Sequence, residues 1–506
     1  MLAKIKGYGL YGIKGYPVTV EVDVANGLPM FDIVGLPDAS VKESRERVRS
    51  ALRNSGFEMP NARITVNLAP ADIKKEGALY DLPIAIGLLT ASGQLNCDSI
   101  SDYIFVGELS LDGSLRGVAG VLPMVIDARQ HGETAVLLPK ANAPEGAYVE
   151  GIAVYGAEDL NGVVDHLNGR SILHKEEVRA WQPGMNGAMV PDFADIRGQE
   201  GAKRAMEIAA AGGHNILLIG PPGAGKTMLA RSLCGILPEL SFEEALEVTK
   251  IHSVNGTLQD EIISSRPFRS PHHSVSAAAL TGGGMKVKPG EVSLAHCGVL
   301  FLDEFPEFRR DVLEALRQPV EDGFVTVTRV MASVTYPASF MLVASMNPCP
   351  CGHYGTDQCR CTPLQIQRYL GRISGPLLDR IDMHVEMNPV SFHEMTAAPK
   401  GEPSYVIKER VDAARMIQMN RFSDLGIYSN SQMDAKAIEM HCKPDALGER
   451  ILKQAFDGMN LSARAYTRIL KVARTIADLA GSKQILGTHI AEAVQYRSLD
   501  RKYWGV

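Results

Sequence analysis

The sequence predicts an α/β protein built on a parallel sheet, with an α+β domain before it and a helical domain after it. The main observation is segment 215–227, N-I-L-L-I-G-P-P-G-A-G-K-T, where four apolar residues precede a glycine-rich loop and a helix start. A second apolar run, 299–302, ends in two carboxylates, and the chain from about residue 404 onward has helical periodicity. At 506 residues the chain is too long for one hydrophobic core, so we expect about three domains.

The composition is that of an ordinary globular protein, with 45% hydrophobic and 22% charged residues. We expect no membrane span, because no apolar run reaches about 18 residues. The first nine residues lack the apolar core of a signal peptide, so a cytoplasmic location is expected. The net charge of −6 means that any nucleic-acid surface must be local.

The glycine-rich loop matches the P-loop pattern G-x4-G-K-T in the strand–loop–helix frame that this motif requires. Its backbone N–H groups and the helix N-terminus favour a phosphate. We expect Lys226 to contact the β- and γ-phosphates of ATP and the Thr227 hydroxyl to bind Mg²⁺. The predicted nucleotide-binding residues are Gly220, Pro221, Pro222, Gly223, Ala224, Gly225, Lys226 and Thr227.

The first domain is predicted to span residues 1–167. Alternating polarity predicts a strand at Val18–Val24, and apolar spacing predicts a helix at Asp38–Gly56 whose charged residues face solvent. Asp112-Gly113 indicates a hairpin turn. The other predicted elements are strands Ile64–Leu68, Ile104–Leu109 and Val136–Leu138 and a helix at Leu82–Leu89.

Two phrases of this domain, Y-D-L-P-I-A-I-G-L-L and F-V-G-E-L-S-L-D-G-S-L-R-G-V, resemble the Lon-type protease fold, also seen in RadA. Lon proteases use a Ser–Lys pair, and Leu79 and Leu122 stand at those two positions. Neither side chain can act as nucleophile or base, so the resemblance implies a non-proteolytic domain used for binding or assembly. Lys74 and Lys75 either form a contact site or lie in a solvated turn, and we expect the turn.

Residues 168–192 have the mixed, Pro- and Gly-containing composition of a linker, and residues 193–389 are predicted to form the ATPase core. Within the core, the strand 299–302 ends in Asp303 and Glu304. At this distance behind a P-loop, Asp303 is expected to hold the Mg²⁺ shell and Glu304 to polarise the attacking water.

A further strand, Phe340–Met346, ends in Asn347, and the phrase S-G-P-L-L-D-R-I-D follows at 374–382. This order of motifs resembles AAA+ ATPases, as does the segment 195–200 before the helix that ends near Ala211, which resembles their adenine-binding segment. The resemblance implies that Asn347 is a polar sensor and that Arg380 is an arginine finger supplied to the neighbouring subunit. The alternative for Arg380 is a salt bridge to Asp379 or Asp382; motif order favours the finger.

Two insertions define the subgroup: R-P-F-R-S-P-H-H-S at 266–274 followed by T-G-G-G-M-K-V-K-P-G-E at 281–291, and an alternating hairpin at 326–337. The phrase P-G-E-V-S-L-A-H lies at 289–296. With G-V-L-F-L-D-E-F-P-E-F at 298–308, these phrases resemble the YifB/ComM family, in the Mg-chelatase branch of AAA+ proteins. His272 and His273 are adjacent on an extended segment, where side chains point to opposite faces, so we expect a structural or partner-contact role rather than a metal site.

Four of the eight cysteines lie in thirteen residues, in two C-x-C pairs, which argues against a disulfide framework. We call residues 349–361 the cysteine knuckle. Two such pairs can surround one tetrahedral Zn²⁺, and the alternative is four reduced cysteines in a loop. We expect zinc, bound by Cys349, Cys351, Cys359 and Cys361.

Residues 390–506 are predicted to form a helical lid, and the amphipathic stretch 461–477 is its clearest helix. The AAA+ resemblance implies that Arg464 is a second sensor of the γ-phosphate, with Arg468 in reserve. The alternative is a solvated basic face. Residues 461–506 contain eight Lys and Arg against three Asp and Glu, a balance of +5 that could attract nucleotide or DNA phosphates.

The family resemblance implies a homo-hexameric ring that hydrolyses ATP to remodel branched or single-stranded DNA, as ComM-type relatives do in branch migration. Candidate channel elements are Met285–Lys288 and the hairpin tip at Arg329. Alternatives from other classes are a Mg-chelatase ATPase subunit and a chaperone-like remodeller of a protein partner. A Lon-type protease is disfavoured because the Ser–Lys pair is missing.

Overall fold

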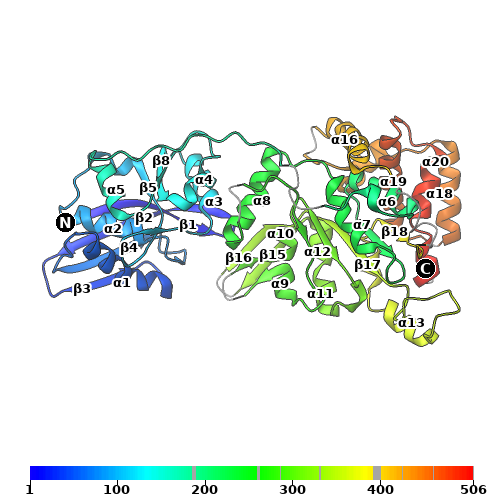
Figure 1. Cartoon of the computed structure of the whole chain (residues 1–506), viewed down its shortest axis with the longest axis horizontal. Coiled ribbons are helices and arrows are strands. Elements are labelled where there is room, and N and C mark those ends of the chain that lie inside the picture. The colour runs from blue at the N-terminus through cyan, green and yellow to red at the C-terminus, as the bar shows by residue number, and fades with distance from the viewer. Residues whose placement is uncertain are drawn as a thin grey trace. The chain divides into compact units, whose positions relative to one another are not determined.

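The computed structural model describes residues 1–184, 190–258, 262–284, 287–329, 332–390, 401–423, 426–459 and 461–504. They form two compact units (Figure 1). The first unit comprises Met1–Gln182 with Ala245–Ile263, and the second comprises Pro183–Glu244 with Ser264–Val506. In the described part of the chain, no helix is both long and apolar enough to cross a bilayer.

The first unit is built on a seven-stranded mixed sheet in the order β3-β4-β2-β1-β5-β8-β9. Alternation along β2 buries Val18, Val20 and Val22 on one face, where α2 and α3 pack. The sheet strands are β1 Leu2–Tyr11, β2 Lys14–Ala25, β3 Met30–Val34, β4 Arg63–Ala69, β5 Tyr103–Phe105, β8 Ala135–Pro139 and β9 Ala153–Ala157. The remaining elements are α1 Ala39–Asn54, α2 Asp81–Ala91, α3 Val121–Gln130, α4 Ala143–Gly146, α5 Leu160–Leu167, the hairpin β6 Glu108–Leu109 and β7 Leu115–Arg116, and most of α8 Phe242–Asn255.

The predicted strand Ile104–Leu109 is interrupted, because the chain leaves the sheet after β5. The N–H of Gly107 donates to Leu79 O (3.0 Å), and Gly107 O accepts from the N–H of Leu82 (3.1 Å). Gly107 is therefore paired with the segment that leads into α2, and β6 starts a separate hairpin with β7. That hairpin confirms the turn predicted at Asp112-Gly113.

The expectation of a solvated turn is wrong for Lys75, which is fully buried, and right for Lys74, which is exposed beside Glu76. The Lys75 backbone pairs with the chain entering α1, through Lys75 N–H to Leu36 O (3.1 Å) and Asp38 N–H to Lys75 O (2.9 Å). This pairing turns the side chain inward, where Nζ donates to Ile73 O (2.8 Å). Burial lowers the pKa of the Lys75 ammonium.

Most charged residues of α1 are exposed as predicted, but Arg47 is an exception. Its guanidinium forms a two-pronged ion pair with the buried carboxylate of Asp81, with N–O distances of 2.6 and 3.0 Å. The Asp81 carboxylate raises the pKa of Arg47, so the guanidinium keeps its charge. It joins α1 to the first residue of α2.

The second unit contains a five-stranded parallel sheet in the order β11-β14-β17-β10-β18. The predicted core strands are confirmed, and every residue of β10, β14 and β17 is buried, as expected for strands covered on both faces. The strands are β10 Ile216–Ile219, β11 Phe268–Arg269, β14 Val299–Leu302, β17 Met341–Met346 and β18 Met383–Glu386, with two separate pairs, β12 Gly282–Gly283 with β13 Lys288–Pro289 and β15 Phe324–Arg329 with β16 Ala332–Pro337.

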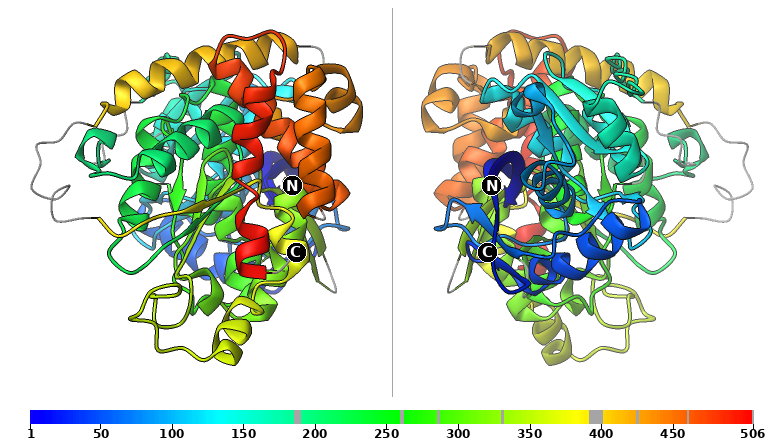
Figure 2. Two further views of the ribbon diagram at one scale, coloured as in Figure 1. Left: turned by 90° about the vertical axis from the view of Figure 1, so that its right-hand side faces the viewer. Right: turned by 90° about the vertical axis from the view of Figure 1, so that its left-hand side faces the viewer.

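Short helices surround this sheet, and a group of longer helices follows it. The helices of the sheet region are α6 Glu200–Gly212, α7 Lys226–Ser232, α9 Ala277–Thr281, α10 Glu291–Leu294, α11 Arg310–Ala315, α12 Arg317–Asp322, α13 Pro363–Leu370 and α14 Gly375–Leu378. The helical C-terminal region, yellow-orange to red in Figure 2, contains α16 Ser404–Arg421, α17 Ala435–His441, α18 Ala446–Met459, α19 Ala463–Leu479, α20 Gly487–Gln495 and α21 Leu499–Trp504. The predicted fold class, an α/β protein with a parallel-sheet core and a helical end, is confirmed.

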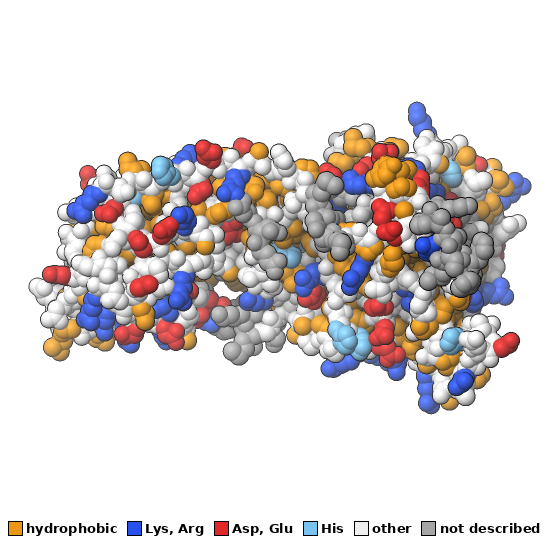
Figure 3. Space-filling model, viewed as in Figure 1, with side chains coloured by type: hydrophobic (Ala, Val, Ile, Leu, Met, Phe, Trp, Pro, Cys, Tyr) orange, Lys and Arg blue, Asp and Glu red, His pale blue; other side chains and the backbone are white. Residues whose placement is uncertain are grey.

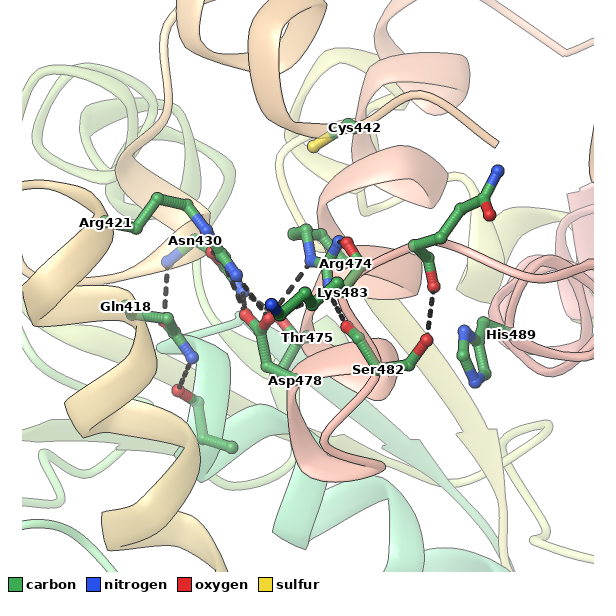
Figure 4. A network of polar contacts seen from close by, with 12 residues as sticks. Gln418, Arg421, Asn430, Cys442, Arg474, Thr475, Asp478, Ser482, Lys483 and His489 are labelled. Atoms are coloured by element: carbon green, nitrogen blue, oxygen red, sulfur yellow. Dashed lines mark hydrogen bonds and ion pairs between the residues drawn. The ribbon is translucent and has the colours of Figure 1, made fainter. Parts of the chain in front are cut away.

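A buried polar network holds the helices of this C-terminal region together (Figure 4). The Asp478 carboxylate on α19 accepts hydrogen bonds from Arg421 (2.5 and 2.8 Å), Arg474 (3.1 Å) and Asn430 (2.8 Å). Gln418 of α16 donates to the backbone of Ala211 in α6 (2.9 Å), so the network reaches the sheet region. The helical C-terminal region and the sheet region belong to the same compact unit.

The Arg47–Asp81 pair gives a stability prediction for the first unit. Arg47→Ala leaves a buried carboxylate without its cation, which costs about 3 kcal/mol. Arg49→Ala, on the same helix but paired at the surface, should change stability by less than about 0.5 kcal/mol. Urea unfolding of the full-length variants measures both. Equal unfolding midpoints would show that other groups suffice to hold Asp81.

Candidate functional site

The predicted ATPase residues meet at one edge of the parallel sheet. The P-loop follows β10, Asp303 and Glu304 follow β14, and Asn347 follows β17. Because neighbouring parallel strands end at the same edge, these three segments lie next to one another.

The P-loop has the backbone that its glycines permit. Gly225 precedes α7 with φ of +86°, in the left-handed region that favours glycine. A Cβ on Gly220 would lie 2.7 Å from Met387 O, so no larger residue fits between the loop and the chain beyond β18. Gln199, before α6, donates to Asn388 O (2.6 Å), which ties the predicted adenine-binding segment to the same chain.

The ammonium group of Lys226 donates hydrogen bonds to three oxygen atoms of the protein. Its Nζ donates to Gly220 O (2.7 Å), Pro221 O (2.9 Å) and Asn347 Oδ1 (3.1 Å). Burial lowers the pKa of this ammonium, while the nearby carboxylates of Asp303 and Glu304 act against that shift. The structure thus brings Asn347, the predicted sensor, into direct contact with the P-loop lysine.

Asp303 is the centre of a second group of contacts. Its Oδ2 accepts from the Thr227 hydroxyl (2.9 Å), and its Oδ1 accepts from the Ser345 hydroxyl and from the Glu304 N–H (3.0 Å). A threonine hydroxyl beside a carboxylate supplies the oxygen ligands that Mg²⁺ prefers. The two predicted Mg²⁺ residues are therefore adjacent.

Glu304 has a left-handed backbone (φ +53°) and an exposed side chain, and its Oε2 lies 3.2 Å from Nδ1 of His273. The rings of His272 and His273 have centroids 4.0 Å apart, so the expectation that they point to opposite faces is wrong. The reason is that His273 lies in a turn rather than in an extended strand. His273 consequently contacts the predicted catalytic glutamate.

Arg380 pairs with neither Asp379 nor Asp382, the two alternatives given by the sequence. Its guanidinium forms an ion pair with Glu321 of α12 and donates to Pro376 O (2.7 Å), leaving 12% of the side chain exposed. The two neighbouring carboxylates are paired elsewhere: Asp382 with Arg468 (2.9 Å) and Asp379 with Arg497 (4.0 Å).

Arg464 is exposed at the start of α19, whereas Arg468 and Lys471 turn inward. Arg468 is engaged by Asp382, and Lys471 Nζ donates to Ser431 O (2.8 Å). Burial lowers the pKa of Lys471 to about 8. A solvated basic face is therefore wrong for these two residues, and Arg468 is not available as a reserve sensor in this conformation.

The four cysteines of the cysteine knuckle converge, with all Sγ atoms within 4.8 Å of one another. Cys349 is buried, and the other three are half-buried. The backbone N–H groups of Arg360 and His353 lower the pKa of the Cys351 thiol to about 6.

The arginines of the R-P-F-R phrase are bound internally. Arg269 forms a two-pronged pair with Glu291 of the P-G-E phrase (2.7 and 2.8 Å), and Arg266 donates to Glu244 (3.0 and 3.2 Å) and to Cys297 O (2.7 Å). Of the candidate channel residues, Met285 and Lys286 lie outside the described residues, as does the side chain of Arg329. Lys288 is exposed in β13.

The sequence did not predict three contacts of site residues. They are the contacts of Ser345 with Asp303, of His273 with Glu304 and of Glu321 with Arg380. Ser345 had a signal, since it is the only hydroxyl in the apolar run of β17. His273 had a signal in the conspicuous H-H pair. Glu321 is an ordinary helix-surface glutamate in the sequence, and its partner is 59 residues away.

Three family models match the chain. "Magnesium chelatase, subunit ChlI" matches residues 192–395, "Subunit ChlI of Mg-chelatase" residues 20–142, and "Magnesium chelatase, subunit ChlI C-terminal" residues 401–497. Together they include the P-loop, the strand ends, the cysteine knuckle and most of the helical end.

Similar proteins cover the whole chain. Competence protein ComM of Haemophilus influenzae is 48% identical over 504 residues, 99% of this chain and 98% of that protein. The uncharacterized protein YifB of Escherichia coli is also 48% identical, over 97% of this chain and 96% of its own length. The magnesium-chelatase 38 kDa subunit of Rhodobacter capsulatus is 29% identical over 33% of this chain and 54% of its own.

The two arginines of α19 are distinguished by a pair of substitutions. Arg464→Ala should leave stability within about 0.5 kcal/mol of the parent, because the side chain is exposed, and should slow ATP turnover if Arg464 senses the γ-phosphate. Arg468→Ala should cost about 3 kcal/mol, because Asp382 remains buried and charged. Urea unfolding and ATPase rates of both variants measure this. Parental turnover in Arg464→Ala would refute the sensor role.

Proposed function

Because the chain belongs to the ComM/YifB family of Mg-chelatase-like AAA+ ATPases, we propose that it is a ring-forming motor that uses ATP hydrolysis to remodel branched DNA. The observation that carries this proposal is the coexistence of two features. The predicted residues Lys226, Thr227, Asp303 and Asn347 meet at the sheet edge, and the similarity to ComM extends over 99% of the chain. The coarser function, an ATPase, follows from the family.

In the proposed reaction, the P-loop N–H groups and Lys226 bind the phosphates of ATP. Thr227 and Asp303 are the residues that would hold Mg²⁺, which neutralises phosphate charge when bound. Lys226 now donates to the loop's own carbonyls, so it must exchange these for phosphate oxygens. Asn347, the third residue that Lys226 contacts, would then respond to nucleotide binding through its hydrogen bond with Lys226.

Glu304 is the proposed base that orients the attacking water. Its exposed carboxylate acts electrostatically on Lys226, and its neighbour Asp303 is already engaged by Thr227 and Ser345. This leaves Glu304 as the carboxylate whose oxygens can bind water. For that role the Glu304–His273 contact has to break, or a water molecule has to bind between the two side chains.

We propose six subunits, with Arg380 as the finger supplied to the neighbouring nucleotide site. Glu321 neutralises Arg380 in the single chain, so reaching a γ-phosphate requires breaking this pair. Exchanging a carboxylate partner for a phosphate keeps the guanidinium paired, which makes the exchange inexpensive. A cytoplasmic location fits such a motor.

DNA is the proposed substrate, bound through phosphates. Lys and Arg are interspersed with Asp and Glu on the face shown in Figure 3, and the net charge is −6, so local cations must provide the contact. Backbone contacts carry no base information, so binding should be independent of sequence and sensitive to salt. A chelatase role is less well supported, because the match to the Rhodobacter capsulatus subunit covers 33% of the chain. The second candidate is a chaperone-like remodeller of a protein.

The motor is tested by dissociation of a four-way junction with ATP or with a slowly hydrolysed analogue. We expect dissociation only with ATP, and none in Glu304→Gln, which should still bind ATP, or in Lys226→Ala, which should not. The triple variant Lys286→Ala, Lys288→Ala, Arg329→Ala should lose DNA-stimulated turnover and keep basal turnover, because phosphate contacts are lost away from the site. Equal dissociation with ATP and the analogue, or no junction binding at low salt, would favour the protein remodeller.

The finger is tested by mixing subunits. Arg380→Ala should bind ATP normally and hydrolyse it poorly, because its own P-loop is intact and its neighbour lacks the finger. Adding Lys226→Ala subunits, which cannot bind ATP but supply Arg380, should restore some turnover. As a control, Arg372→Ala removes a nearby arginine that pairs with Glu307 (2.6 Å) and should retain turnover. Parental turnover in Arg380→Ala alone would refute the trans arrangement.

A further inference from the structure

The cysteine knuckle has a geometry that thiols packed at random do not produce. Cys349 Sγ lies 3.3 Å from Cys351 Sγ and 3.9 Å from Cys359 Sγ, and Cys351 and Cys359 are 3.8 Å apart. A disulfide would place two sulfurs about 2.05 Å apart, so these are separate thiols. Four sulfurs at about 2.3 Å from one tetrahedral Zn²⁺ are about 3.8 Å from each other. The two distances to Cys359 Sγ match this value and the Cys349–Cys351 distance is shorter, so the four thiols are gathered closely enough to surround one ion.

The donor set identifies the metal class. All four candidate ligands are cysteine sulfurs, a donor set that suits Zn²⁺ or iron and disfavours hard ions such as Mg²⁺. Short turns shape the loop around them: Gly352 N–H donates to Cys349 O (3.0 Å), and Cys359 N–H donates to Thr356 O (3.0 Å). These turns bring the two C-x-C pairs face to face.

The knuckle also touches the nucleotide site. A Cβ built on Gly352 would lie 2.5 Å from Cδ of Pro222, so the knuckle backbone packs directly on the P-loop. Cys349 is two residues beyond Asn347, whose side chain accepts from Lys226. On another side of the knuckle, the ring of Tyr354 lies 5.9 Å from that of Tyr503 in α21. The cysteine knuckle therefore contains or adjoins two residues that contact the P-loop: Gly352 beside Pro222 and Asn347 beside Lys226.

We propose that Cys349, Cys351, Cys359 and Cys361 bind one Zn²⁺, and that this ion holds Gly352 against Pro222 and so keeps the P-loop in its nucleotide-binding form. Without the ion, no covalent or coordinate bond closes the loop between the two cysteine pairs, and the Gly352 contact loses its support. Zinc binding and ATP affinity are then linked. This proposal does not depend on the DNA substrate.

The metal is tested on full-length protein purified without chelator, by elemental analysis for zinc and iron. We expect about one zinc per chain in the parent and in Cys97→Ser, a control cysteine in the first unit. Cys351→Ser/Cys359→Ser should lose the zinc. Absence of zinc from the parent, or iron in its place, overturns the site, as does parental zinc content in the double variant.

The link to the P-loop is tested by titrating a fluorescent ATP analogue in the presence of Mg²⁺. Cys351→Ser/Cys359→Ser should bind it on the order of tenfold more weakly than Cys97→Ser. Gly352→Ala and Gly355→Ala form a matched pair that does not remove a ligand. Both glycines have φ near +80° (+82° and +83°), but a Cβ meets Pro222 only at Gly352, and nothing within 4 Å at Gly355.

Both glycine variants should retain zinc, and Gly352→Ala alone should weaken nucleotide binding, by roughly tenfold. Equal affinities in the two variants overturn the contact mechanism, because the backbone strain is the same in both. Parental affinity in the zinc-free double variant overturns the link itself. Junction assays are not needed for either result, so failure here and failure of the DNA motor are distinguishable.

Discussion

Asp382 is a carboxylate with almost no exposed surface at the point where the sheet and the helical C-terminal region meet. It accepts from the Asn215 N–H (3.0 Å), lies 3.3 Å from His214 Nδ1 and pairs with Arg468 (2.9 Å). Burial would raise its pKa, but Arg468 and His214 hold the pKa well below its ordinary value, so the group is charged at neutral pH. Since a buried charge must keep its partners, the starts of β10 and β18 and the helix α19 are held together here.

The contacts of Asp382 anchor the helical C-terminal region to the starts of the strands. From His214, hydrogen bonds continue to Thr475 (2.7 Å), then to Asn430 (3.0 Å) and Asp478, the network of Figure 4. The anchor lies at the strand starts, whereas the phosphate-binding edge lies at the strand ends. Arg464 precedes Arg468 by one turn of α19, so the proposed sensor lies within one helical turn of this anchor.

Local patterns were sufficient for the core strands β10, β14 and β17 and for the P-loop, because an all-apolar run between turn residues has few other solutions. The sequence also identified the side chains that meet at the sheet edge, since parallel strands fix where their ends lie. It could not decide which acidic group pairs with which arginine. Arg380 pairs with Glu321 and Arg47 with Asp81, and both choices depend on helices that pack only in the folded chain. The expectation that Lys75 lies in a solvated turn is wrong for the same reason, because its backbone pairs with residues 36–38 and the side chain is buried.

Because the sequence does not show which cations are paired internally, a count of charges says little about the proposed DNA contact. The balance of +5 in residues 461–506 treats each cation as available, yet most of them are bound within the second unit. The internally bonded cations of this stretch are Arg468, Lys471, Arg474, Arg497 and Lys502. Arg266 and Arg269 are likewise paired with carboxylates. A cation that a carboxylate already neutralises adds nothing to the net positive charge that would attract DNA, even where, as proposed for Arg380, a phosphate can replace that carboxylate. The basic count of residues 461–506 is therefore no argument for DNA binding by the helical region.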